Sequence, residues 1–235
     1  PCPALRHSPA CRLPPAAFDM SHNTSVHSSP SPKISRAGRR SRPSRRRRVH
    51  PHEDNDGPVP SFAEVVDRRT SIRSFTDDPV SDQSLRDALL LARRAPSAGN
   101  LQAYQVVIVR DEETKLAIGR AAVGQMWIAD APVVLVFLAH PDRSGIKYGR
   151  RGRSLYAVQD ATIAAAYAQL ALEAEGLASC WVGAFQEDIV AASVGSSYYY
   201  GGEEGSRGSG LRPVVVMPVG VQAGGGTHRH HRRGL

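Results

Sequence analysis

Three short stretches of the sequence carry side chains that could bind a phosphate-bearing or planar ligand. The first is residues 69–73, which read Arg-Thr-Ser-Ile-Arg. Because alternate residues of an extended segment point the same way, Arg69, Ser71 and Arg73 are expected to project together, with Thr70 between them. Two guanidinium groups and a hydroxyl match phosphate oxygens, so this stretch predicts an anion site. A solvent-exposed helix end is the alternative interpretation.

The second stretch is residues 95–102, which read Ala-Pro-Ser-Ala-Gly-Asn-Leu-Gln and join a predicted helix to a predicted strand. Small residues such as Ala98 let the backbone approach a flat ligand. Ser97 and Asn100 offer hydrogen-bonding groups there. An ordinary turn explains the same composition, because proline, serine, glycine and asparagine are common turn residues.

The third stretch is residues 179–185, which read Ser-Cys-Trp-Val-Gly-Ala-Phe. We expect a strand through Val182 to end in the small residues Gly183 and Ala184, where exposed backbone N–H groups could donate to a ligand. The alternative is that the two aromatic residues only fill the core. Cys180 is expected to be a buried free thiol, which fits a reducing compartment such as the cytoplasm.

The sequence lacks the motifs of several other kinds of binding and catalytic site. The sequence contains no P-loop, no Gly-x-Gly-x-x-Gly and no recognisable nucleophile triad or carboxylate pair. We therefore predict no acid, base or nucleophile among the side chains. His228, His230 and His231 have no cysteine or carboxylate beside them to complete a metal site, so no metal is predicted.

Periodicity predicts the elements that must position these stretches. Ser61 and Glu64 have the spacing of a capping box at a helix start. Helices are expected over 62–69, 82–95, 112–122, 156–175 and 187–192. Strands are expected over 105–110, 132–138, 179–182 and 213–219. The sum is an α+β fold, an α/β sandwich with a small central sheet flanked by helices.

The charge of the chain is unevenly distributed. The 235 residues carry a net charge of +8, but residues 1–50 hold ten Arg, one Lys and one Asp, so the rest carries −2. Residues 1–57 are predicted to be a disordered basic tail rich in Pro, Ser and Arg, 58–223 a folded domain, and 224–235 a Gly/His/Arg-rich tail. A nearly neutral domain does not indicate a nucleic-acid groove. No apolar run approaches the roughly 20 residues that span a membrane.

The three stretches, in this order, resemble the nitroreductase family. That family shows Arg-x-Ser-x-Arg, then Ala-Pro-Ser-x-x-Asn-x-Gln-Pro-Trp, then Gly-Leu-x-Ser-x-x-x-Gly after a long helix. The last pattern matches residues 176–183 of this sequence. The resemblance covers residues 62–185 and again 212–221. Ala103 and Tyr104 stand where the family usually has Pro-Trp.

The resemblance implies a nitroreductase-like fold and a homodimer with FMN at the interface. It implies that hydride passes from NAD(P)H through flavin N5 to small oxidised organic acceptors, such as nitroaromatics or quinones, by a ping-pong mechanism. One alternative is a flavin-binding protein without turnover, for storage or sensing. Another is a nucleic-acid-binding protein that uses its Arg-rich tail.

The family's cofactor-binding positions carry over residue by residue. They are Arg69, Thr70, Ser71, Arg73, Pro96, Ser97, Ala98, Asn100, Gln125, Val182, Gly183, Ala184 and Arg232. The resemblance places Arg69 and Ser71 on the phosphate and ribityl chain, and Arg73 near flavin N1 and O2. It assigns residues 96–100 to the partner subunit's flavin. Gly183 and Ala184 are expected to present N–H groups toward N5.

Overall fold

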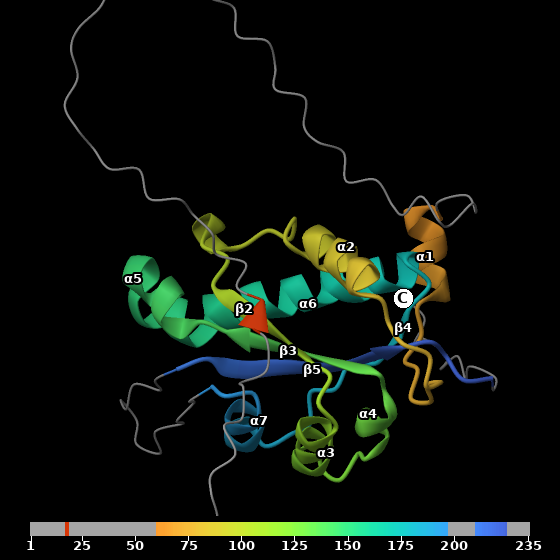
Figure 1. Ribbon diagram of the computed structural model, residues 1–235. Coiled ribbons are helices and arrows are strands. Elements are labelled where there is room, and N and C mark those ends of the chain that lie inside the picture. Colours follow the sequence, from red (N-terminus) through yellow and green to blue (C-terminus); the bar gives the residue numbers. More distant parts are fainter. Residues whose placement is uncertain (1–16, 19–59, 197–209, 225–235) are drawn as a thin grey trace, which may run out of the picture.

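A small antiparallel sheet forms the centre of the protein. The computed structural model describes residues 17–18, 60–196 and 210–224 (Figure 1). The sheet has the order β1-β2-β3-β5-β4. Its strands are β1 (Ala17–Phe18), β2 (Tyr104–Val109), β3 (Val133–Ala139), β4 (Ala178–Ser179) and β5 (Arg212–Gly220). Of the tail predicted at residues 1–57, the structure describes only 17–18, whose backbone pairs with β2.

Helices cover both faces of this sheet, as Figure 1 shows. One face carries α1 (Phe62–Arg68), α2 (Asp82–Ala92), α5 (Pro141–Arg151) and α6 (Ala157–Ala174). The other carries α3 (Glu112–Ala121), α4 (Trp127–Asp130) and α7 (Glu187–Ser193). The short helical turns η1 (Ala98–Asn100) and η2 (Gly152–Tyr156) complete the described elements. The predicted α+β sandwich is confirmed, and five of these helices match predicted ones.

Strand β3 is the core of the fold. All seven of its residues are buried, and alternate residues serve the two faces. Leu135 and Phe137 belong to the cluster that contains residues of α2 and α6. Val134 and Val136 belong to the cluster on the side of α3 and α7. The prediction that this strand is covered on both faces is confirmed.

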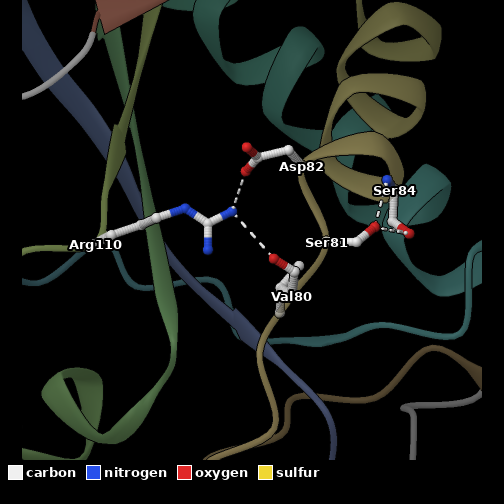
Figure 2. Close-up of polar contacts among 5 residues, drawn as sticks. All are labelled: Val80, Ser81, Asp82, Ser84 and Arg110. Atoms are coloured by element: carbon white, nitrogen blue, oxygen red, sulfur yellow. Dashed lines mark hydrogen bonds and ion pairs between the residues drawn. The ribbon is translucent and has the colours of Figure 1, made fainter.

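Side chains define the helix starts as the sequence predicts. Ser61 and Glu64 form the capping box of α1, with Ser61 N donating to Glu64 Oε2 at 2.7 Å. Ser81 Oγ accepts from Ser84 N at the start of α2. Arg110, which follows β2, donates to Val80 O at 3.1 Å and pairs with Asp82 (Figure 2). This contact ties the start of α2 to the end of a central strand.

Two parts of the observed fold differ from the predictions. The strand expected over 179–182 is shorter, because β4 ends at Ser179 and Val182 makes only an isolated bridge to Val216. Helices α5 and α4 were not predicted. Within the described part of the chain, no helix has the length and apolar character needed to cross a membrane.

The segment after α1 is fixed against the sheet by backbone bonds. Ile72 N donates to Ser179 O at 3.1 Å, and Thr76 N donates to Val221 O at 2.9 Å. Phe75, the residue before Thr76, is buried. These bonds hold residues 69–73 beside the end of β4, which is the placement that the first and third stretches need to act together.

Gly220 makes this docking possible, because a Cβ there would lie 2.7 Å from Pro132 Cδ and 3.0 Å from Phe75 Cδ1. We expect Gly220→Ala to lower the free energy of unfolding by about 1–3 kcal/mol through overpacking. Gly224→Ala is the matched control, since its Cβ would meet nothing within 4 Å. Urea denaturation measures both variants. Equal unfolding midpoints for the two would contradict the prediction.

Candidate functional site

The first and third sequence stretches meet around Cys180. Ser71, Arg73 and Arg69 lie close enough to Cys180 to lower the pKa of its thiol, and Cys180 Sγ donates to Trp181 O at 3.9 Å. Ile72 is buried while Ser71 and Arg73 are exposed on the other side of the segment. The prediction that alternate residues project together is therefore confirmed for Ser71 and Arg73.

Cys180 is a neutral part of this site. Burial raises the pKa of its thiol, and Arg73, the Ser71 hydrogen bond and Arg69 oppose that shift only in part. The residue is 1% exposed and free of disulfides. Because the net shift is upward, the thiol stays protonated at neutral pH. The positive charge of the arginines is therefore not neutralised by a thiolate.

Trp127 positions Arg73. The guanidinium of Arg73 lies over the Trp127 ring, 5.9 Å from its centroid. Trp127 opens α4, directly after the loop that contains Gln125. Gln125 Nε2 donates to Ala122 O at 2.9 Å, so its amide closes the end of α3 in this structure. Sequence reasoning singled out Gln125 and missed Trp127, whose indole face beside an arginine is a cation–π contact.

Arg69 lies near Glu173 as well as near Cys180, and we call Arg69, Ser71, Arg73 and Cys180 the arginine pocket. Burial raises the pKa of the Glu173 carboxyl, and the charges of Arg69 and Arg68 partly oppose this. Glu173 belongs to the last turn of α6. The arginine pocket is thus located at the C-terminal end of α6.

The backbone around Val182 is fixed by the sheet. Val182 N donates to Val216 O at 2.9 Å, and Val216 N donates to Val182 O at 3.0 Å. Its polar backbone groups are therefore used within the sheet. Gly183 and Ala184 follow as exposed residues. Of the three predicted positions here, Val182 is buried and these two are exposed. Arg232 lies outside the described residues, as does the polar loop at 197–209.

A buried carboxylate fixes the backbone of the second stretch, residues 95–102. Asp160 Oδ1 accepts from Ala98 N at 2.9 Å, and Asp160 Oδ2 accepts from Ala103 N at 3.2 Å. Ser97 Oγ accepts from Gln102 N at 2.9 Å within the turn. Asp160 is 2% exposed; burial raises its pKa, and the two backbone bonds oppose this. No local sequence pattern indicates this role.

The turn itself is strained. Asn100 has φ +58° and Gln102 has φ +49°, both in the left-handed region that side-chain-bearing residues rarely adopt. Such conformations persist where surrounding contacts enforce them, and they cluster at ligand sites. Asp160, together with Arg143, which donates to Gln102 O at 2.8 Å, supplies those contacts. This favours a binding turn over an ordinary connection.

The two parts of the candidate site lie at opposite ends of α6 in one chain. The turn is bonded to Asp160 and the arginine pocket lies beside Glu173, which is 13 residues further along the helix. At 1.5 Å per residue the separation along α6 is about 20 Å. In Figure 1, α5 lies toward one end of α6 and α1 and β4 toward the other. The structure therefore does not bring the first and second stretches together within a single chain.

The residues of the arginine pocket fit FMN. Arg69 and Arg73 supply guanidinium groups that match phosphate and a developing negative charge, and Ser71 supplies a neutral hydroxyl. Gly183 and Ala184 leave the backbone open where a flat ring could approach. The chemistry of the donor set agrees with a ligand that carries a phosphate at one end and a planar ring at the other.

Asp160→Asn tests the role of the buried carboxylate. Asparagine keeps one acceptor oxygen but turns an NH₂ group toward the second backbone N–H, so a buried donor loses its partner. We expect the free energy of unfolding to fall by about 1–3 kcal/mol. Asp77→Asn, the same change at an exposed position, is the control. Chemical denaturation of both variants checks this, and an unchanged midpoint for Asp160→Asn would show that the two bonds contribute nothing.

Two known proteins are similar in sequence to parts of this chain. A Thermus thermophilus protein named NADH dehydrogenase is 37% identical over 155 residues, covering 54% of this chain and 76% of that protein. A Bacillus subtilis protein named FMN reductase [NAD(P)H] is 43% identical over 82 residues, covering 35% of this chain and 32% of that protein.

Solved structures agree on the fold. A nitroreductase family protein from Clostridium novyi matches with TM-score 0.58 and 25% identity, covering 69% of this chain and 86% of that one. The NADPH:FMN oxidoreductase from Vibrio harveyi, solved with NAD⁺, matches with TM-score 0.60 and 22% identity, covering 72% of each chain. The sequence model of the nitroreductase family matches residues 66–130 and 119–199, more than half of the chain. On these grounds the chain belongs to the nitroreductase family.

Proposed function

We propose that the protein is an FMN-dependent oxidoreductase that passes hydride from NAD(P)H to small oxidised organic acceptors, such as nitroaromatics or quinones, by a ping-pong mechanism. The proximity of Arg69, Ser71 and Arg73 to Cys180, three residues before the exposed Gly183, carries this proposal. The names of the relatives, among them an FMN reductase and an oxygen-insensitive NADPH nitroreductase, support the cofactor and the donor.

The residues of the pocket have separate roles in this proposal. Arg69 and Ser71 bind the phosphate and ribityl chain. Arg73, held over Trp127, places a cation near N1 and O2 of the ring, where negative charge develops on reduction. Bound FMN supplies the redox chemistry, in which flavin N5 accepts and returns the hydride. Gly183 and Ala184 offer backbone N–H groups near that atom.

A homodimer is part of the proposal, because one chain cannot bring the turn at 96–100 to its own arginine pocket. Exposed apolar side chains suit such an assembly. Phe62 and Val66, one turn apart on α1, are 75% and 47% exposed, and Tyr167 on α6 is 43% exposed. A two-fold symmetric contact would cover these residues and place Pro96, Ser97, Ala98 and Asn100 beside the partner's flavin. The buried free thiol of Cys180 fits the predicted cytoplasmic location.

The first test is the visible absorption spectrum of the purified protein supplied with FMN. We expect flavin bands that bleach when NADH or NADPH is added without air, because the bound flavin is reduced. Bands that persist with both donors would favour a flavin-binding protein without turnover. A chain that takes up no FMN would overturn the proposal.

Arg73→Gln tests the electrostatic role of this side chain. Without the cation, reduced flavin loses stabilisation relative to oxidised flavin, so the midpoint potential should become more negative. The shift is about 30 mV for each tenfold change in the equilibrium. Spectroelectrochemistry of the FMN-bound protein measures it. Arg73→Lys keeps the charge and should recover part of the shift, and Arg86→Gln, an exposed arginine of α2, controls for overall charge. Equal potentials in all variants would exclude the role.

A further inference from the structure

Positive charge is concentrated in the segment of α5 and η2. Residues 141–156 contain five cations and one acid, Asp142, whereas residues 51–235 as a whole carry −2. Asp142 is paired with Arg153. Lys147, Arg150 and Arg151 are exposed. The segment thus places a local surplus of cations on the surface of a nearly neutral domain.

A break in the backbone gathers part of this segment into one place. Gly149 interrupts α5 with φ +56° and ψ −139°, a conformation that favours glycine. The chain then packs back on itself, since a Cβ on Gly152 would lie 2.5 Å from Ser144 O, and one on Gly145 would lie 2.6 Å from Arg153 Cγ. The π-helical turn η2 follows at once. Such turns recur at functional sites.

The result is a cluster of two tyrosines, each with a cation on its ring. The rings of Tyr148 and Tyr156 meet edge to face with centroids 5.2 Å apart. Lys147 Nζ lies 5.4 Å from the Tyr148 centroid, and the Arg151 guanidinium lies 5.4 Å from the Tyr156 centroid. Arg151 Nε also donates to Tyr156 Oη at 3.0 Å. We call Lys147, Tyr148, Arg151 and Tyr156 the tyrosine–cation cluster.

This cluster lies against the strained turn at 96–102. A Cβ on Gly99 would fall 2.8 Å from Lys147 Nζ and closer still to Tyr148 Oη. Arg143, on the same helix, is bonded to Gln102 O. The cations are therefore beside the backbone proposed to line the flavin ring, and at the opposite end of α6 from the arginines proposed to bind the FMN phosphate.

We propose that the tyrosine–cation cluster binds the phosphate-bearing adenosine half of the nicotinamide dinucleotide. The inference rests on the proposed function, because it assigns the outer part of the donor's site. A dinucleotide presents phosphates one ribose away from its nicotinamide, so cations beside the flavin-lining turn are placed to meet them. Guanidinium and ammonium groups bind phosphate, and aromatic rings pack against a base. The cluster holds a cation 5.4 Å from the centroid of each partly exposed tyrosine ring.

The test compares a charged donor with an uncharged one on the FMN-loaded full chain. NADPH carries phosphates, whereas 1-benzyl-1,4-dihydronicotinamide transfers the same hydride without them. The readout is the ratio of kcat/KM for NADPH to kcat/KM for the uncharged donor. Lys147→Gln and Arg151→Gln should each lower this ratio about fivefold, as expected for a partly screened contact, mainly through KM for NADPH. Raising the salt concentration should lower the ratio of the parent protein.

Three controls make the outcome decisive. Lys147→Arg keeps the charge and should retain a ratio near that of the parent. Arg120→Gln removes an exposed cation from α3, on the other face of the sheet, and should not change the ratio. Size-exclusion chromatography and flavin content show whether each variant is assembled. A ratio unchanged in well-assembled Lys147→Gln and Arg151→Gln overturns the inference. If neither donor reduces the flavin of the parent protein, the proposed function itself fails.

Discussion

The geometry of the turn at residues 96–102 depends on the two hydrogen bonds that Asp160 accepts from Ala98 N and Ala103 N. Both carboxylate oxygens are used, and they fix the two ends of a turn that contains left-handed Asn100 and Gln102. Burial opposes the charged form of Asp160, so its upward pKa shift is the cost of placing a carboxylate there. An apolar side chain would remove that cost but leave two N–H groups in the interior without acceptors.

Helix α6 connects this turn to the arginine pocket and also separates them. Its buried alanines let it lie close to the sheet, and its ends carry Asp160 and Glu173. Because the helix is rigid over this span, the two groups of candidate flavin contacts keep a fixed separation within one chain. In the proposed homodimer, the turn of a second copy would lie beside the first copy's arginines. The proposed flavin site would then need residues from both copies.

Short-range sequence patterns predicted the features that depend on residues close together in the chain. The capping box at Ser61 and Glu64, the buried strand β3 and the alternation through Ser71 and Arg73 all follow from spacing. The role of Asp160 could not be predicted this way, since its partners lie 62 and 57 residues away in sequence. Helix α5 was missed because its glycines and many cations hide any apolar periodicity. Trp127 was missed because its contact with Arg73, 54 residues away in sequence, has no local sequence signal.

The net charge of a domain does not show where on its surface an anion can bind. A net charge of −2 over residues 51–235 does not indicate a broad basic groove, yet it is compatible with a compact group of cations. Charges on a protein surface act over about 8 Å at physiological ionic strength, so a bound phosphate responds to its neighbours and not to the sum. The break at Gly149 brings Lys147 and Arg151 onto adjacent tyrosine rings. Backbone geometry, which the composition does not report, therefore decides where an anion can bind.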